Sequence, residues 1–314
     1  MARLTGNERA TPATALRHAV PYIRMYKGKV FVLKAGGEAF TSPEATRALV
    51  EQIGILHQVG IRVVLVHGGG PQSTQLAERL GLTSRIVEGR RVTDEATLDV
   101  ATMVLNGRIN TRILAACRAI GLPAVGISGV DGGLVRAHKR SPVTLASGAI
   151  VDYGFVGDID RVDADVVHKL LDDGLVPIVS SLSADDEGTL LNINADTVAA
   201  ALACALGAEK LMLATGAPGI LESKDDPRSL ISYIDRAGLG RLKSEGKITD
   251  GMLPKVASIE HALAGGVRRV HVISYSLPDS LLLEVFTTEG TGTLVVDRLE
   301  HLRPEEQHGE SHGA

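Results

Sequence analysis

Two glycine-rich loops, each after a run of β-branched residues, are the first places in the chain where chemistry is expected. Lys34-Ala35-Gly36-Gly37 follows the apolar run 30–33, and His67-Gly68-Gly69-Gly70-Pro71-Gln72 follows the run 63–66. Glycines let backbone N–H groups approach a ligand, and a helix that starts at such a loop favours an anion. Either loop alone is equally typical of a sharp strand-to-helix turn. A pair of such loops, one of which begins with a lysine, predicts a phosphoryl site with one loop as each of its opposite walls.

Three basic residues lie at or before the starts of predicted helices. Arg90 and Arg91 precede a helix that begins near Asp94, and Lys255 lies in a first helical turn after Pro254. An arginine pair in a turn is usually only solvated, but beside a phosphate site a guanidinium can bind a substrate carboxylate through two parallel hydrogen bonds. A lysine in a first turn is repelled by the helix dipole, which indicates an acidic neighbour or an anionic ligand.

A polar cluster and a turn mark the second half of the chain. Asn192, Asn194 and Asp196 lie at the start of a helix whose apolar residues recur at 198, 201, 202, 205 and 206. One of them is enough to cap the helix, so the surplus indicates a polar site. Thr215 to Gly219 form a turn at the carboxyl end of a predicted strand, where open α/β sheets bind ligands.

Phosphoryl transfer is the chemistry that suits these groups. The sequence contains neither Gly-x4-Gly-Lys-Ser/Thr nor Gly-x-Gly-x-x-Gly, and it lacks His-Glu-x-x-His and Gly-x-Ser-x-Gly. Two lysines at glycine or proline loops, one aspartate among asparagines and two glycine-rich turns remain. Phosphoryl transfer needs mainly positioning and positive charge, and no covalent nucleophile, so this set is sufficient for it.

Alternating strands and helices must position these residues, and the alternation predicts an α/β fold with one continuous, mainly parallel sheet. We expect strands at 30–33, 61–66, 175–180, 210–214, 270–274 and 292–297, and helices at 43–60, 71–80, 94 onward, 198–206 and 252–264. The segment 121–160 predicts short antiparallel strands that form a flap or edge, and 222–250 a loop with a surface helix. The segment 13–26 has helical spacing, with Pro21 as a kink or break.

Composition narrows the range of partners. The formal net charge of −4, with 3% aromatic residues and no Trp, gives no support to nucleic-acid binding. Cys117 and Cys204 are far apart in the sequence, and we interpret them as reduced core residues. No apolar run approaches the length that crosses a membrane, and no signal-peptide pattern is present, so a cytoplasmic location is expected.

Taken together, the motifs resemble the amino acid kinase superfamily and, within it, the N-acetylglutamate kinases, from about residue 16 to 296. The resemblance implies an amino acid kinase fold, a three-layer αβα sandwich. It divides the chain into an N-terminal extension (1–26), an acyl amino acid-binding half (27–190), a nucleotide-binding half (191–300) and a disordered tail (301–314). Six motifs in family order carry it: 34–37, 67–72, 91–94, 154–157, 192–196 and 251–255.

By that resemblance, ATP phosphorylates the side-chain carboxylate of N-acetyl-L-glutamate, with Mg2+ carried by the nucleotide and no metal bound by the protein itself. Lys34 and Lys255 would neutralise the transferring phosphoryl group, and Asp196 would orient both amines. The residues implied to hold the ligands are Gly69, Gly70, Arg91 and Asn192 for the substrate, and Gly36, Gly37, Thr215 and Gly219 for ATP.

The resemblance also implies regulation and assembly. Family members with an added N-terminal helix form arginine-inhibited rings, so residues 13–26 predict a dimer-based homo-oligomer that extends to a hexamer. Glu284 and Gly290 match the arginine-site region. An exposed glutamate on a surface helix is the simpler interpretation of Glu284.

Departures from the family pattern leave alternatives open. Ala35 replaces an aromatic residue, Gly216 replaces an aspartate in the nucleotide half, and Val130 replaces a lysine. Both ends of the chain resemble the kinase-like domain of N-acetylglutamate synthases, although the tail after Val296 is too short for an acetyltransferase domain. A non-catalytic arginine-binding subunit that partners such a synthase, or a kinase for a related acylated acidic amino acid, are therefore the competing hypotheses.

Overall fold

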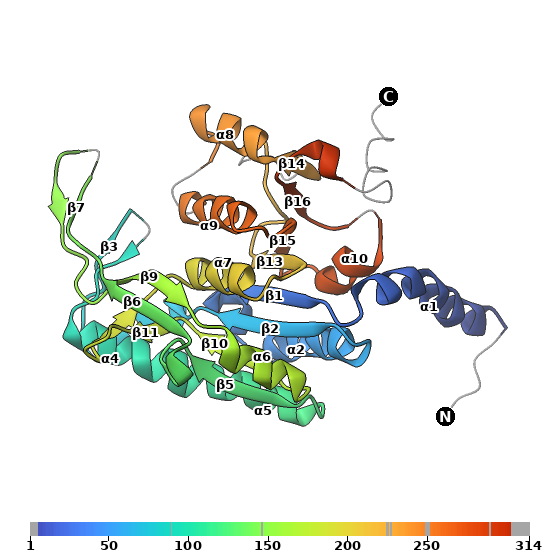
Figure 1. Cartoon of the computed structure of the whole chain (residues 1–314), viewed down its shortest axis with the longest axis horizontal. Coiled ribbons are helices and arrows are strands. Elements are labelled where there is room, and N and C mark those ends of the chain that lie inside the picture. Colours follow the sequence, from blue (N-terminus) through green and yellow to red (C-terminus); the bar gives the residue numbers. More distant parts are fainter. Residues whose placement is uncertain are drawn as a thin grey trace.

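An eight-stranded sheet runs through the molecule in the order β14-β16-β15-β13-β1-β2-β10-β5, and every neighbouring pair is parallel except β15–β16 (Figure 1). The computed structural model describes residues 6–88, 90–145, 147–223, 226, 228–248, 252–288 and 290–302, with side chains from residue 13 onward except that of residue 301. The strands are β1 (Val30–Ala35), β2 (Arg62–His67), β5 (Ala124–Ser128), β10 (Val176–Ser180), β13 (Lys210–Thr215), β14 (Tyr233–Asp235), β15 (Arg269–Ser274) and β16 (Thr293–Val296).

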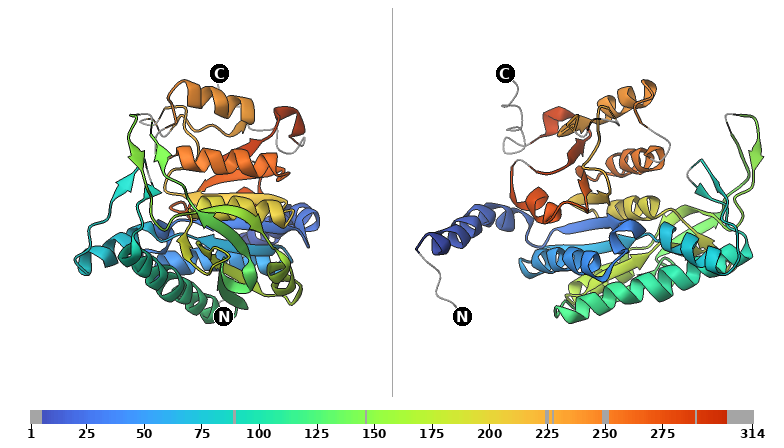
Figure 2. Two further views of the ribbon diagram at one scale, coloured as in Figure 1. Left: turned by 60° about the vertical axis from the view of Figure 1, so that its left-hand side comes forward. Right: turned by 180° about the vertical axis from the view of Figure 1, so that it is seen from behind.

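Helices cover both faces of this sheet because its strands are apolar on both sides. In β1, Val30 and Val32 join the core on one face, whereas Phe31 and Leu33 join the core on the other. The first face is covered by α6 (Asp165–Asp172), α7 (Ala195–Ala205), α8 (Arg236–Ser244) and α9 (Leu253–Ala264). The second is covered by α2 (Pro43–Gln58), α3 (Gly70–Arg79), α4 (Glu95–Thr102), α5 (Thr111–Ala119) and α10 (Ser280–Phe286). Figures 1 and 2 show these layers, which confirm the predicted three-layer fold.

Capping side chains begin the helices that carry the predicted motifs. The Ser42 hydroxyl accepts a hydrogen bond from the Ala45 N–H at 3.1 Å, which confirms the predicted start of α2. Asn194 caps α7 through the N–H groups of Asp196 and Thr197, at 2.8 and 3.3 Å. Asn194 is therefore the structural member of the polar cluster, which leaves the side chain of Asp196 for another role.

A smaller sheet and two hairpins lie beside the main sheet. The four-stranded sheet is ordered β12-β11-β6-β9. Its strands and those of the hairpins are β6 (Val135–Lys139), β9 (Gly157–Val162), β11 (Leu182–Ala184), β12 (Leu190–Asn192), β3 (Ile86–Val87), β4 (Arg90–Arg91), β7 (Val143–Thr144) and β8 (Ile150–Val151). Figure 1 shows both hairpins projecting from the same end of the molecule.

Three local predictions need correction. The segment 121–160 is not wholly antiparallel, because β5 pairs in parallel with β10 at the edge of the main sheet; the β6–β9 and β7–β8 pairs are antiparallel as expected. The segment 222–250 contains β14, an additional strand of the main sheet. Helix α1 (Gly6–Tyr26) continues past Pro21 and is not broken there.

Helix α1 extends away from the body of the molecule in Figures 1 and 2, with Leu16 62% exposed. The chain then ends its described part in a short 3-10 helix, η4 (Leu299–His301). The predicted disorder of the tail concerns residues that, from 303 onward, lie outside the described part. Within the described residues, no helix combines the length and apolarity needed to span a bilayer.

Candidate functional site

Asp196 joins the two lysines that the sequence singled out. The Nζ of Lys34 lies 3.0 Å from Asp196 Oδ1, and the Nζ of Lys255 lies 3.1 Å from the same oxygen. Lys34 comes from β1, Asp196 from the first turn of α7 and Lys255 from the first turn of α9. The three side chains are only 10–12% exposed. Residues 59 to 221 positions apart in the sequence thus form one buried charged triad.

The charges of this triad perturb one another. Burial by itself raises the pKa of Asp196, but the charges and hydrogen bonds of Lys34 and Lys255 outweigh it and lower that pKa below its usual range. Burial and repulsion from Lys34 lower the pKa of Lys255, although Asp196 opposes the shift. Two cations and one anion leave a net positive charge, which is the condition under which an anionic ligand is attracted.

The two glycine loops touch each other beside this triad. A Cβ on Gly37 would lie 2.9 Å from the Cα of Gly69, so neither loop has room for a side chain there. The Gln72 side chain fixes the contact, because its Nε2 donates to the Gly37 carbonyl at 2.6 Å. The loops therefore form adjoining walls of one site.

A cavity of about 330 Å³ opens between the loops, β4 and the start of α7. Among the residues predicted for substrate, phosphate or catalysis, it is lined by Lys34, Gly36, Gly37, Gly69, Gly70, Arg91, Asn192 and Asp196. A cavity with a buried charged triad at one end and a guanidinium among its walls can hold a small anionic molecule beside a phosphoryl group.

Arg91 and Asn192 are held in place by neighbouring oxygens. Arg91 donates from Nη1 to the Ser84 hydroxyl at 2.6 Å, and from Nη2 to the Thr74 hydroxyl at 2.6 Å and the Gly70 carbonyl at 3.2 Å. Burial lowers the pKa of Arg91. The amide of Asn192 donates to the Thr93 hydroxyl at 3.3 Å. Arg91 thus braces the second glycine loop as well as lining the cavity.

Thr215 and Gly219, predicted for ATP, do not line this cavity. Thr215 ends β13, the strand beside β1, where Leu213 pairs with Lys34. Gly219 is buried, and a Cβ there would lie 2.6 Å from both Leu230 Cδ1 and Thr293 Oγ1. Packing therefore already requires a glycine at 219, and the nucleotide role of both residues stays a prediction.

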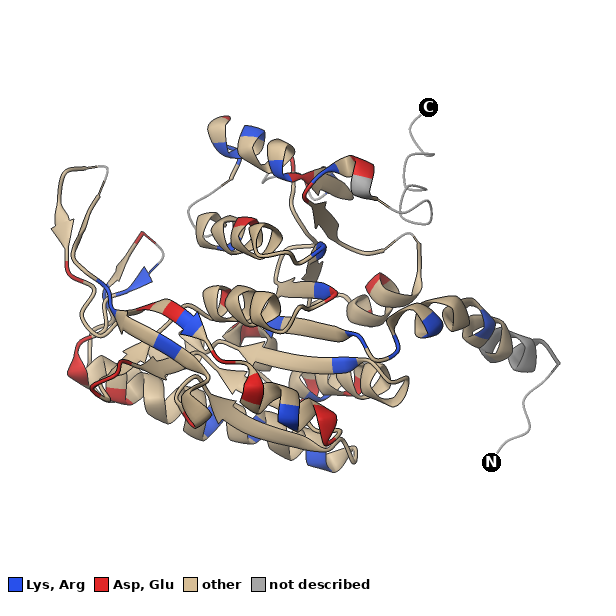
Figure 3. Ribbon diagram, in the orientation of Figure 1, with Lys and Arg blue, Asp and Glu red and all other residues tan. Residues whose placement is uncertain are grey.

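The sequence interpretation missed other residues of the cavity wall. Glu38, Ser73, Arg90 and Ser181 also line it. Glu38 follows the first glycine loop directly, so its position in the sequence was a usable signal. Arg90 was recognised as one of a pair with Arg91 but was given no role of its own. Figure 3 shows basic residues on β4, at the hairpin end of the molecule.

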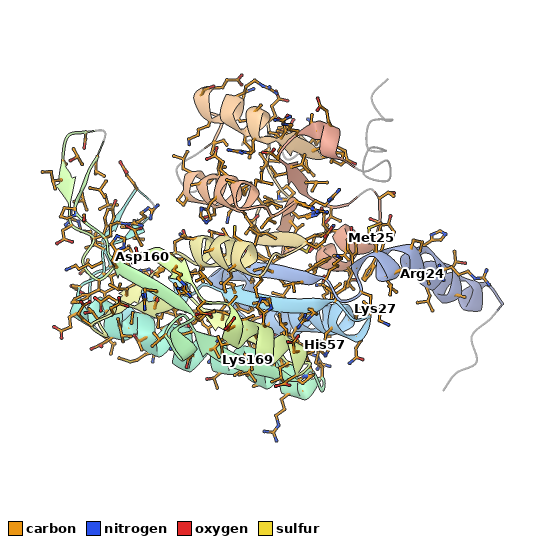
Figure 4. All side chains as sticks on the ribbon, in the orientation of Figure 1. Arg24, Met25, Lys27, His57, Asp160 and Lys169 are labelled. Atoms are coloured by element: carbon orange, nitrogen blue, oxygen red, sulfur yellow. The ribbon has the colours of Figure 1, made fainter. Side chains whose placement is uncertain are left out.

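A second cavity, of about 50 Å³, lies between α1, α10 and the far end of the main sheet. Glu284 and Gly290, predicted for arginine, both line it, and Figure 4 labels Met25 where α1 approaches α10. Glu284 is not the exposed surface residue of the simpler interpretation, because only 7% of it is exposed. Its carboxylate bonds to His271 Nδ1 at 2.6 Å and accepts from the Thr291 N–H at 2.6 Å.

The pKa of Glu284 reflects these bonds. Burial alone raises the pKa, but the hydrogen bond and charge of His271, with the Thr291 N–H, lower it to about 2. His271 Nε2 in turn lies 3.1 Å from Lys210 Nζ. A buried carboxylate that is ionised at neutral pH therefore forms one wall of the second cavity.

Known proteins with similar sequences are kinases. A family model described as "Amino acid kinase family" matches residues 29–274. The chain is 48% identical over 290 residues to the acetylglutamate kinase of Myxococcus xanthus, which covers 91% of this chain and 94% of that protein. It is 44% identical to the acetylglutamate kinase of Symbiobacterium thermophilum, over 90% of this chain and 97% of that one.

Solved structures show the same fold. N-acetylglutamate synthase from Neisseria gonorrhoeae, complexed with coenzyme A and L-arginine, matches with a TM-score of 0.79 and 28% identity. The match covers 91% of this chain and 65% of that one. The same synthase with coenzyme A and N-acetyl-glutamate matches with a TM-score of 0.80 and 29% identity, over 91% of this chain and 63% of that one.

Proposed function

The chain belongs to the amino acid kinase family and, within it, to the acetylglutamate kinases, and on this premise we propose that it transfers the γ-phosphoryl group of ATP to the side-chain carboxylate of N-acetyl-L-glutamate. A carboxylate oxygen would bond to phosphorus as the bond to ADP breaks, which gives an acyl phosphate. This is the kinase step expected in arginine biosynthesis. The observation that carries the proposal is the pair of ammonium groups on one oxygen of Asp196.

The two lysines address the main physical obstacle, which is that two anions must meet. Repulsion between a carboxylate and a phosphoryl group at contact distance in a site sheltered from water costs on the order of several kcal/mol. Lys34 and Lys255 would offset this repulsion from two sides of the transferring group. Asp196 would keep both amines in position without a rearrangement at the moment of reaction.

Backbone and side-chain donors would hold the reactants. We assign the N–H groups of Gly36 and Gly37 to the phosphates, and those of Gly69 and Gly70 to the substrate and the transferring group. Arg91 and Asn192 would contact the α-carboxylate and the amide of the acetylamino acid from the half 27–190. Thr215 and Gly219 would contact the nucleotide from the half 191–300. Residues 1–26 would be an N-terminal extension of the kinase domain.

Magnesium would arrive with the nucleotide. Among the described residues, no group of three His, Cys, Asp or Glu side chains is arranged to hold a metal ion. Oδ1 of Asp196 already accepts both lysines, and Glu38 is the other carboxylate of the cavity wall. We therefore assign the ligands of the ion to phosphate oxygens and water, and the ion would supply further positive charge to those phosphates.

An ADP-release assay on the wild type and on Lys255→Ala tests the proposal. We expect turnover with N-acetyl-L-glutamate to fall by roughly 10²–10³-fold in the variant, because one of two fixed cations is lost. The fold should survive, since the substitution also removes the repulsion between Lys255 and Lys34. Absence of ADP production by the wild type at high enzyme concentration would contradict the proposal. A panel including an acylated aminoadipate would separate the substrate alternatives.

We propose arginine as an effector bound in the second cavity. An ionised, buried Glu284 beside a cavity at the base of α1 supports a cationic ligand, and Gly290 leaves space there. Arginine should raise the melting temperature of the wild type and lower its activity. Stabilisation by arginine without any stabilisation by ATP would favour the non-catalytic subunit instead. The homo-oligomer and the cytoplasmic location stay predictions.

A further inference from the structure

His67 is a fully buried histidine that connects the second glycine loop to the core of the molecule. It is the last residue of β2. Its Nδ1 lies 3.3 Å from the carbonyl oxygen of Gly68, and its Nε2 lies 3.2 Å from Nδ2 of Asn110. The proposed phosphoryl transfer gives this side chain no role, although the glycines that follow it line the cavity.

The partners of the imidazole ring determine which ring nitrogen carries the proton. A carbonyl oxygen can only accept, so Nδ1 must donate to Gly68. The amide nitrogen of Asn110 donates one N–H to the Ile178 carbonyl at 2.9 Å, and its other N–H is directed to Nε2 of His67. Nε2 is therefore the acceptor, and the ring is neutral with its proton on Nδ1. Burial favours the neutral form as well, because it lowers the pKa of His67 to about 4.

Neighbouring elements hold the ring and its amide partner in place. Asn110 ends the π-helical segment η2 (Met103–Asn110), and a Cβ on Gly126 of β5 would lie 1.9 Å from its Oδ1, so the glycine leaves room for the amide. On its other side, the ring of His67 contacts Phe40 edge to face, with ring centroids 6.3 Å apart. The orientation of the ring is thus set by contacts outside the loop to which it bonds.

The bond from His67 to Gly68 determines how the next peptide group faces. In a trans peptide the C=O and the following N–H point in opposite directions, so a Gly68 carbonyl turned toward the buried ring turns the Gly69 N–H away from it. That N–H makes no hydrogen bond within the part of the chain that the structure describes, whereas the Gly68 N–H already donates to the Ala35 carbonyl at 3.0 Å. Gly69 lines the cavity, so its N–H is the donor that the loop leaves for a ligand.

From these contacts we propose that His67 is a positioning residue for phosphoryl transfer, whose Nδ1–H holds the Gly68–Gly69 peptide so that the Gly69 N–H faces the transferring group. The inference rests on the proposed function and deepens it, because it names the side chain that presets one donor of that site. A peptide between two glycines has little preference for one orientation. Without the bond to Nδ1 it would be free to turn and present a carbonyl oxygen to an anion, whereas a donor fixed in advance needs no rearrangement during the reaction.

Two substitutions test the two ring nitrogens separately. His67→Asn places an amide nitrogen near the position of Nδ1 and keeps a donor for the Gly68 carbonyl. His67→Gln places its amide near the position of Nε2 and keeps only a partner for Asn110. We expect His67→Gln to lower kcat about 10- to 100-fold, with KM for N-acetyl-L-glutamate changed less than about threefold. His67→Asn should keep kcat within about fivefold of wild type. Urea unfolding should show a loss of stability in both variants, so a role in packing alone predicts equal effects on kcat.

A spectroscopic measurement tests the tautomer without turnover. In long-range 1H–15N NMR correlations of wild type at pH 7, His67 should have a protonated Nδ1 and an unprotonated Nε2, its signals being those that disappear in the His67 variants. His138→Gln, at an exposed position on β6, is the matched control and should leave kcat unchanged. An inactive wild type would defeat the proposed function. An active wild type with the proton on Nε2 of His67, or with equal kcat in His67→Asn and His67→Gln, would overturn the role of His67 alone.

Discussion

At the scale of single residues, the shared oxygen of Asp196 makes the two lysines interdependent. We predict that Asp196→Asn destabilises the fold by about 3 kcal/mol, because it leaves two mostly buried ammonium groups without their counter-ion. Activity should fall by at least about 10²-fold, since both cations lose their alignment. Urea unfolding and the ADP-release assay measure the two effects.

The exposed Asp99→Asn is the matched control and should be neutral in both assays. Adding Lys255→Met to Asp196→Asn removes one of the repelling charges. The double variant should regain part of the lost stability and none of the lost activity. If stability does not recover, repulsion between the lysines is not the cause of the loss.

Glu284 predicts a pH-dependent contribution to stability. Its pKa of about 2 in the folded state is below the unfolded value of about 4.5, so the ionised form stabilises the fold. That stabilisation, roughly 3 kcal/mol, is complete above pH 4.5 and is lost as the pH falls from there through 2. The unfolding free energy of wild type should exceed that of Glu284→Gln at pH 5. Below pH 4.5 the gap should narrow.

Glu51→Gln, at an exposed position on α2, should show no such gap at any of these pH values. A gap between wild type and Glu284→Gln that stays constant down to pH 3.5 would mean that Glu284 does not act through its charge.

At the scale of elements, a π-helix packs closely against the second glycine loop. The segment η2 (Met103–Asn110) links α4 to α5, and a Cβ on Gly69 would lie 2.7 Å from Ile109 Cδ1 and 2.8 Å from Leu105 Cδ2. π-helical turns are rare and often accompany functional sites. Asn110 of this segment donates to the Ile178 carbonyl at 2.9 Å, so the helix is fixed to the sheet.

We predict that Gly69→Ala lowers stability by about 1–3 kcal/mol, because the loop or η2 must move. Gly70→Ala is the matched control, since a Cβ there meets open space, and its stability should stay within about 0.5 kcal/mol of wild type. Thermal unfolding of both variants measures the difference. Equal melting temperatures of the two variants would show that η2 or the loop moves without loss of stability.

Most elements could be predicted from the sequence, because they depend on local signals. The meeting of Lys34, Asp196 and Lys255 depends on tertiary structure, and only the resemblance to the N-acetylglutamate kinases implies it. Apolar runs, glycine stops and the Ser42 cap indicated most strands and helices of the main sheet. Strand β14 was missed because Tyr233-Ile234-Asp235 is too short to show a period. The parallel pairing of β5 and the π-turns of η2 depend on tertiary contacts.

At the scale of the whole molecule, α1 packs against α10. It projects from the body, and Leu16 is 62% exposed on it (Figure 1). If α1 joins subunits, Leu16→Glu should reduce the molar mass in solution while the melting of each protomer stays cooperative. Leu80→Glu, at a position 56% exposed at the end of α3, should leave the mass unchanged. Light scattering after size-exclusion chromatography makes the comparison. An unaltered mass in Leu16→Glu would exclude this face as an interface.

The β3–β4 and β7–β8 hairpins share a small apolar cluster. Val87 and Val92 beside the first hairpin pack with Leu145 of the second and with Val151 and Tyr153. Arg91 of β4 lines the cavity, so the cluster couples the β7–β8 hairpin to one wall of the cavity. A protein that binds the β7–β8 hairpin would therefore act on that wall from a distance, without occupying the cavity.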